Sequence, residues 1–171
     1  MPLAQTTDTT AWRTHRDPAG FSLFQPAAWS VRSAGPGDIV VSHPTGSAAA
    51  MVRTRIVPPG QTLAAWLQQG YPATEPGLHN VRMLQVEARD PRIASALFDY
   101  GSPVFEGRAS LVAVRRGDLA TLFVAAAARV DFSTRLPELT RVLDSVRFAA
   151  TGDGMPRAQR LLEIGIDLPA R

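Results

Sequence analysis

The chain has 171 residues, of which 45% are hydrophobic and 19% are charged, and its formal net charge is +3. This length suits one domain with short tails, since a domain usually comprises ~100–200 residues. The lack of cysteine excludes disulfides, thiolate metal ligands and a thiol nucleophile. No unbroken apolar run reaches the ~18–20 residues that a membrane-spanning helix needs, so we expect no membrane span.

All 18 basic residues are arginines, so there is neither a lysine for a Schiff base nor the lysine of a phosphate-binding loop. The arginines are spread from Arg13 to Arg171, whereas nucleic-acid binding needs them gathered on one face. We therefore expect no nucleic-acid partner. The opening residues show no basic segment followed by an apolar core. This pattern predicts a cytoplasmic location, or an extracytoplasmic one if a signal has been removed.

Turn-forming residues divide the first half of the chain into short strands and one helix. Asp17-Pro18-Ala19-Gly20 is a turn by composition, and Thr62 is typical of a helix N-cap, with Gly70 as the helix end. The predicted elements are, in chain order, strands around Phe21–Phe24 and Trp29–Val31, a loop over Ser33–Gly37, strands over Asp38–Ser42 and Ala48–Val57, a helix with Leu63, Trp66 and Leu67 on one face, and a loop over Tyr71–Asn80.

The second half predicts two hairpins and a longer helix. Asp90-Pro91 and Gly117-Asp118 are two-residue connections of the kind that join antiparallel neighbours. The stretch Leu119–Ala128 is apolar at both parities except for Thr121, which predicts a strand covered on both faces. The predicted elements are strands over Val81–Arg89, Arg92–Tyr100, Arg108–Arg116 and Leu119–Ala128, a helix over Ser133–Ser145 capped by Ser133 or Thr134 with Pro137 in its first turn, a strand over Val146–Phe148, a linker over Thr151–Gly154 and a short amphipathic helix over Met155–Ile164.

This order of elements predicts an α+β fold, a three-layer α/β/α sandwich with a mostly antiparallel central sheet. We expect a flexible lead-in over residues 1–11, the sandwich domain over residues 12–149 and a tail over residues 150–171. A short amphipathic helix in the tail docks either on its own sheet or on another chain, so a homodimer is one expected state.

Turn formers and aromatic residues near both ends of the domain form a pattern: Trp12, Asp17–Leu23, Pro26 and Trp29–Val31 at one end, and at the other a helix that runs into Leu143–Phe148. The first part resembles the N-terminal pattern "DP…GFS…P…W.V" of the PsbP-like family, and the second resembles the C-terminal pattern of that family. Relatives in that family include Ran-binding Mog proteins, bacterial lipoproteins and EagR-type chaperones. The resemblance implies a bacterial member with an antiparallel sheet sandwiched by helices, and it implies no common catalytic set.

Residues for metal or nucleophilic chemistry are few. His15, His43 and His79 are far apart and lack the spacing of metal ligands, so we expect no metal site and no cofactor. Ser102 lies in the polar loop Asp99–Pro103 but lacks the Gly-x-Ser-x-Gly elbow of a nucleophile. We therefore expect no enzymatic activity.

Three carboxylates, Glu87, Asp99 and Glu106, fall on neighbouring predicted strands. Paired carboxylates carry out acid/base chemistry when their environments separate their pKa values. Each of them has arginine neighbours in sequence, however, and cross-strand ion pairs are the interpretation that we favour. The arginines concerned are Arg89, Arg92 and Arg108.

We predict a non-enzymatic protein-binding module that presents its loops to an unidentified protein partner. Trp29 and Trp66 are expected as core anchors. One alternative is a small-ligand carrier or enzyme with an apolar pocket between helix and sheet, where Ala125–Ala128 leave room and Trp66 and Phe123 form the lining. Another, implied by the resemblance, is an EagR-like chaperone for apolar segments. The presented loops are Ser33–Gly37, Tyr71–Asn80 and Asp99–Gly107, and the candidate contact residues are Trp12, Tyr71, Tyr100, Ser102 and Glu106.

Overall fold

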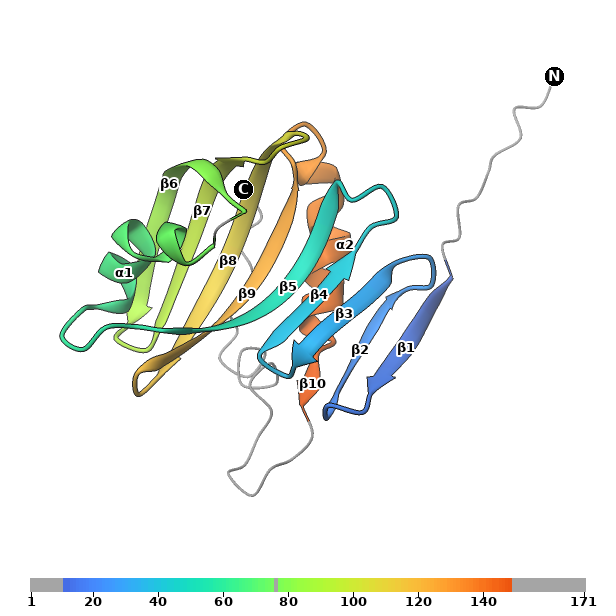
Figure 1. Cartoon of the computed structure of the whole chain (residues 1–171), viewed down its shortest axis with the longest axis horizontal. Helices are drawn as coiled ribbons and strands as arrows, with labels where there is room; N and C mark the ends of the chain where they lie inside the picture. The colour runs from blue at the N-terminus through green and yellow to red at the C-terminus, as the bar shows by residue number, and fades with distance from the viewer. Residues whose placement is uncertain (1–10, 76, 149–171) are drawn as a thin grey trace.

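The computed structural model describes residues 11–75 and 77–148. Within these ranges the chain forms two sheets, two α-helices and one 3-10 helix (Figure 1). The elements are β1 (Trp12–Asp17), β2 (Phe21–Pro26), β3 (Ser30–Gly35), β4 (Asp38–Ser42), β5 (Ala48–Ile56), α1 (Leu63–Gln69), η1 (Tyr71–Thr74), β6 (His79–Asp90), β7 (Ile93–Gly101), β8 (Glu106–Arg116), β9 (Leu119–Ala128), α2 (Phe132–Asp144) and β10 (Arg147–Phe148).

The larger sheet has seven strands in the order β3-β4-β5-β9-β8-β7-β6, and the smaller has the order β1-β2-β10. Neighbouring strands are antiparallel in both sheets. The tight connection Gly117-Asp118 joins β8 to β9, as predicted, and Gly117 takes a positive φ of 62° there. Such a backbone conformation suits glycine, because it has no Cβ to clash.

Strand β9 lies fourth of seven, and all of its residues except Leu119 are buried. Its odd-numbered residues, such as Phe123 and Ala125, join one hydrophobic core, while Leu122 and Val124 join a second core. Because successive side chains of a strand point to opposite faces, the two cores lie on opposite sides of the sheet. The prediction of a central strand covered on both faces is confirmed.

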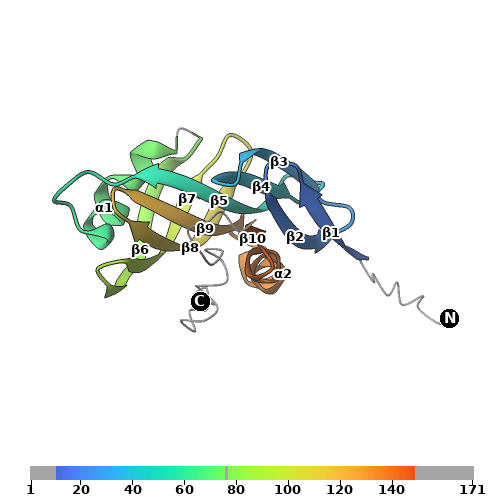
Figure 2. The ribbon, with the colours of Figure 1, turned by 90° about the horizontal axis from the view of Figure 1, so that it is seen from below.

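One helix packs on each face. The buried side of α2 belongs to the first core, and α2 contacts β9, β5, β8 and β2; Figure 2 shows it beneath the strands. Helix α1 belongs to the second core and contacts β6 and β7. Thr62 caps α1 as predicted, since its hydroxyl accepts a hydrogen bond from the Ala65 amide at 3.1 Å. The structure is therefore an α+β fold with a mostly antiparallel sheet, in which each helix covers only part of its face.

Several predicted boundaries were wrong. Strand β1 was not predicted, because its exposed positions are polar and only its pairing with β2 reveals it. Strand β3 continues to Gly35, into the predicted loop Ser33–Gly37, and the predicted loop Tyr71–Asn80 contains η1 and the start of β6. Helix α2 begins one residue earlier than predicted, at Phe132, whose side chain is buried in the core.

Pro137 therefore stands inside helix α2 rather than in its first turn, and neither Ser133 nor Thr134 is the cap. The residue at the cap position is Asp131, whose side chain makes no capping hydrogen bond. The predicted linker and helix in the tail, and the lead-in apart from Ala11, lie outside the described residues. In the described part of the chain, neither α-helix has the length and apolar character needed to cross a bilayer.

Gln25 is a polar residue inside the first core. It lies on the same face of β2 as the core residues Phe21 and Leu23, and it is 0% exposed. Among the described residues neither atom of its amide has a hydrogen-bond partner. Burying an amide in this way costs about 1–3 kcal/mol.

We expect Gln25→Met, which keeps the length of the side chain and removes the amide, to raise the free energy of unfolding by about 1–2 kcal/mol. The measurement is chemical denaturation, and Gln68→Met on the exposed side of α1 is the matched control. A loss of stability in the Gln25 variant would contradict this prediction.

Candidate functional site

A pocket of about 460 Å³ opens on the α1 side of the seven-stranded sheet. Strands β5, β9, β8 and β7 form its floor, and residues of η1 and of the turn after it form the opposite wall. The lining residues are Met51, Arg53, Arg55, Tyr71, Glu75, Gly77, Leu78, Phe98, Tyr100, Ser102, Ala109, Val124 and Ala126.

The floor is apolar, and small side chains give it depth. Ala109 on β8 and Ala126 on β9 are direct partners in the ladder and are 1% and 5% exposed. Phe98 and Val124 belong to the same core and line the pocket beside them. Two methyl groups set among larger side chains leave a hollow over the middle of the sheet.

Aromatic rings in edge-on and tilted contact form one wall. The ring centroids of Tyr71 and Phe98 are 5.8 Å apart, and those of Phe98 and Tyr100 are 6.1 Å apart. Trp66 of α1 extends the row behind Tyr71 at 5.8 Å, and Phe105 extends it beyond Tyr100 at 6.4 Å. These geometries are favourable for aromatic pairs, so the wall is held by its own packing.

Both tyrosines of the wall are neutral at physiological pH. Burial raises the pKa of Tyr71 far above its usual value, and the nearby Glu75 carboxylate raises it further. Burial also raises the pKa of Tyr100 to about 12. A phenol that keeps its proton acts in hydrogen bonding and packing, and is a poor nucleophile.

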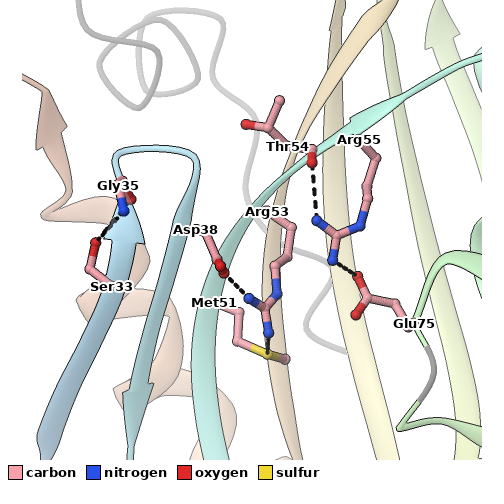
Figure 3. A network of polar contacts seen from close by, with 8 residues as sticks. All are labelled: Ser33, Gly35, Asp38, Met51, Arg53, Thr54, Arg55 and Glu75. Atoms are coloured by element: carbon pink, nitrogen blue, oxygen red, sulfur yellow. Dashed lines mark hydrogen bonds and ion pairs between the residues drawn. The ribbon is translucent and has the colours of Figure 1, made fainter.

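Two arginines on β5 give the pocket its charge. Arg53 and Arg55 extend side by side on the same face of the strand (Figure 3). Arg53 forms an ion pair with Asp38 of β4 and contacts the Met51 sulfur at 3.9 Å. Arg55 donates to the Thr54 carbonyl at 3.0 Å and forms an ion pair with Glu75 at 2.6 Å. The second ion pair ties the turn after η1 to the sheet.

Each guanidinium keeps unused donor capacity. The Nε atoms of Arg53 and Arg55 are buried, and within the described ranges neither has a hydrogen-bond partner. An arginine has five N–H donors in a planar fork, so ion pairing through a terminal nitrogen leaves others available.

A second, more polar hollow of about 350 Å³ lies on the α2 side, between the start of β3 and α2. His43 lines it, with its ring edge-on to Trp29 at 5.4 Å, and burial followed by the charge of Arg135 lowers its pKa. Arg135 is itself paired with Glu138 at 3.2 Å. In residues 11–75 and 77–148 we found no group of three potential side-chain ligands that would hold a metal ion.

Three of the five candidate contact residues from the sequence line the 460 Å³ pocket: Tyr71, Tyr100 and Ser102. The other two lie elsewhere. Trp12 stacks on Phe24, with their ring centroids 5.2 Å apart, and Arg141 of α2 lies 4.2 Å from its ring centroid. The Glu106 side chain is 74% exposed and contacts Arg129.

The expected lining of an apolar pocket was wrong in both named residues. Trp66 packs behind Tyr71, and Phe123 points into the opposite core under α2. Of the alanines Ala125–Ala128, Ala126 lines the pocket. Arg53 and Arg55 were not predicted, although they follow Met51 at alternate positions of a strand whose other face is apolar except for Thr54.

Two of the three carboxylates on neighbouring strands, Asp99 and Glu106, form ion pairs. Asp99 accepts two hydrogen bonds from Arg108, at 2.6 and 3.1 Å, and Arg82 approaches at 3.5 Å. The hydrogen bond from Arg108 is the main reason that the pKa of Asp99 lies below its ordinary value. Glu87 accepts a hydrogen bond from Gln85. The geometry at Asp99 is that of a cross-strand ion pair.

Comparison with known proteins gave structural relatives only. No protein-family model and no curated protein sequence matched. The solution structure of cyanobacterial PsbP (CyanoP) from Synechocystis superimposes with a TM-score of 0.50 and 14% sequence identity, covering 85% of this chain and 97% of that one. This chain shares the fold of cyanobacterial PsbP. The expected PsbP-like architecture is therefore supported at the level of the fold.

Two further structures are similar at lower scores. A protein of unknown function from Pseudomonas aeruginosa, PA94, has a TM-score of 0.45 and 12% identity, and the match covers 74% of this chain and 89% of that one. LpqN of Mycobacterium tuberculosis, described as involved in cell envelope biogenesis, has a TM-score of 0.41 and 14% identity, with 82% and 91% coverage.

A methyl group at position 107 would overlap the ring of Tyr100, its partner across β7 and β8. We expect Gly107→Ala to lower the free energy of unfolding by about 1–3 kcal/mol, because overpacking displaces the ring. Chemical denaturation of the single and double variants tests this. In a Tyr100→Ala background the same substitution should cost much less, and an equal cost in both backgrounds would contradict the contact.

We expect Asp99→Asn to lower the free energy of unfolding at pH 7 by about 1–2 kcal/mol, because a charge-assisted pair with Arg108 is lost. A carboxyl group whose pKa is depressed by folding stabilises the native state above its unfolded pKa of about 3.9, and this stabilisation disappears as the pH falls through the folded pKa. The difference from the parent protein should therefore shrink below about pH 4 in denaturation experiments. Asp118→Asn, which removes a carboxylate from an exposed turn, is the matched control.

Proposed function

We propose that the protein is a non-enzymatic binding protein and that its recognition site is the 460 Å³ pocket on the α1 side of the sheet. The observation that carries this proposal is the pocket itself, which combines an apolar floor with a few polar groups at its edge. Ligand sites typically occupy ~300–1,000 Å³ and have this composition. Its aromatic wall is held by ring packing without a ligand, which favours a preformed site.

The surroundings of Ser102 favour binding rather than catalysis. Its hydroxyl donates to the Phe105 carbonyl at 3.0 Å and accepts from the Phe105 amide at 3.1 Å. These bonds belong to the turn between β7 and β8, so the hydroxyl serves the backbone of its own loop. The neutral phenols of Tyr71 and Tyr100 are likewise suited to hydrogen bonding and packing rather than to nucleophilic attack.

Recognition of a protein partner is a second candidate. Two of the loops expected to meet a partner, Tyr71–Asn80 and Asp99–Gly107, contribute residues to the pocket. Val104, in the turn between β7 and β8, is 82% exposed. These two loops therefore present both pocket residues and an exposed apolar side chain to a binding partner.

The proposal is tested with a neutral, solvent-sensitive apolar dye such as Nile red. We expect saturable binding to the parent protein and a loss of affinity of roughly tenfold or more in Ala126→Leu, since about 1.4 kcal/mol of steric conflict gives that factor. Ala109→Leu fills the same hollow from β8 and is the second variant. The matched control is Ala88→Leu on the exposed edge strand β6.

Thermal melting of each variant shows whether it is folded. The proposal would be refuted if Ala126→Leu and Ala109→Leu both fold and bind the dye with unchanged affinity, or if the parent protein does not bind the dye.

A further inference from the structure

We infer that the ligand of this pocket is an amphipathic carboxylate, whose acid group binds between Arg53 and Arg55 and whose apolar body lies on the floor of the pocket. This inference rests on the proposed function, since it names the chemical class of the ligand for the same site. Three observations carry it: the placement of the two arginines, the charge of the lining and the direction in which the pocket becomes apolar.

The two arginines are placed to hold one anion together. They are two residues apart on β5, so their Cβ atoms lie roughly 7 Å apart on one face. A carboxylate between two guanidiniums at this spacing accepts hydrogen bonds from both, and charge-assisted bonds of this kind are the strong ones. Every terminal nitrogen of the two guanidiniums carries two N–H groups and makes one contact with the described residues, so each has one N–H group to spare.

The protein already shows the same recognition with one of its own side chains. Glu75 places a carboxylate oxygen 2.6 Å from Arg55, at the edge of the pocket, and its side chain is only 15% exposed. Arg53 has its acidic partner outside the pocket, because Asp38 lies on β4 and is 45% exposed. The side of Arg53 that faces the pocket therefore lacks a carboxylate of the protein.

The charged residues that line the pocket favour an anion over a cation. Two arginines and one glutamate give 2 − 1 = +1. A ligand carboxylate brings this balance to zero, whereas an ammonium group would be placed next to two guanidiniums. Arginine stays charged at any physiological pH, so this preference does not depend on titration of the arginines.

The pocket becomes apolar in one direction along the strands. Arg53 is level with Leu122 of β9, while Ala126 lies four residues further along, roughly 13 Å away at ~3.3 Å per residue. Ala109 of β8 is level with Ala126, and Tyr100 lies beyond on β7. A ligand bound by its acid group at Arg53 thus extends over an apolar floor towards the aromatic wall, and Ser102 is the polar lining residue near Tyr100. This length suits a medium-chain fatty acid.

The test compares three ten-carbon probes that differ in head group alone: decanoate, 1-decanol and decylammonium. We expect decanoate to displace the dye at a concentration about tenfold or more lower than that needed for decanol, because of its charge-assisted hydrogen bonds. Decylammonium should be the weakest of the three. In Arg53→Gln, decanoate should lose about tenfold or more in affinity, while the affinity for decanol stays within about twofold.

Arg55→Gln is the second variant, and Arg135→Gln removes an arginine from an ion pair on the other face as the matched control. Thermal melting establishes that each variant is folded. If decanol binds as tightly as decanoate, or if decylammonium binds more tightly, the inference is overturned while the pocket remains a binding site. If the dye itself fails to bind the folded parent protein, the proposed function falls and the inference falls with it.

Discussion

The double burial of β9 is the constraint on which the rest of the structure depends. A strand in the middle of a seven-stranded sheet must satisfy all of its backbone groups in the ladder, and both of its faces must exclude water. The apolar run from Ala120 to Ala128 meets the second condition, with Thr121 as its one polar side chain. Each face then needs a covering layer, and the two faces obtain it in different ways.

The α2 face is closed by a long helix with large side chains. Leu136, Leu139 and Val142 of α2 pack against Phe123 and Val112 in one continuous core. On the other face α1 is about half as long and packs mainly against β6 and β7, at one edge of the sheet. The remaining part of that face, over β5, β9 and β8, is bordered by η1 and by the arginines of β5. The pocket is therefore a consequence of unequal helix cover on the two faces.

The sequence predicted the elements that are specified locally. The turn Gly117-Asp118, the cap Thr62 and the doubly apolar strand over Leu119–Ala128 follow from backbone chemistry and from periodicity, which a single sequence carries. Strand β1 was missed because its exposed side chains are polar and its evidence is its pairing with β2. The predicted three-layer sandwich is not confirmed, because each helix covers only part of its face of the sheet.

The candidate site was predictable only in part, for a geometric reason. Periodicity shows that Phe123 and Val124 point to opposite faces, but the register across the sheet decides which face becomes hollow. The expected lining included Phe123, whereas the hollow lies on the side of Val124 and Ala126. Tyr71 and Tyr100 were predicted because they are aromatic residues in polar loops. This prediction does not depend on the register between strands. Arg53 and Arg55 were not predicted, because their partners Asp38 and Glu75 are distant in sequence.

The arrangement of Arg53 and Arg55 is hard to explain by stability alone. Two guanidiniums on one face of a strand repel each other, and their Nε atoms lose water without gaining a partner among the described residues. Replacing buried ion pairs with apolar side chains of similar volume is often neutral or stabilising. A cover made of leucine or methionine at these positions would close the floor beside Met51 and Val124. Under the proposed function, charge retained at the edge of an apolar hollow would orient the ligand, because its acid group and its apolar body then have only one way to fit.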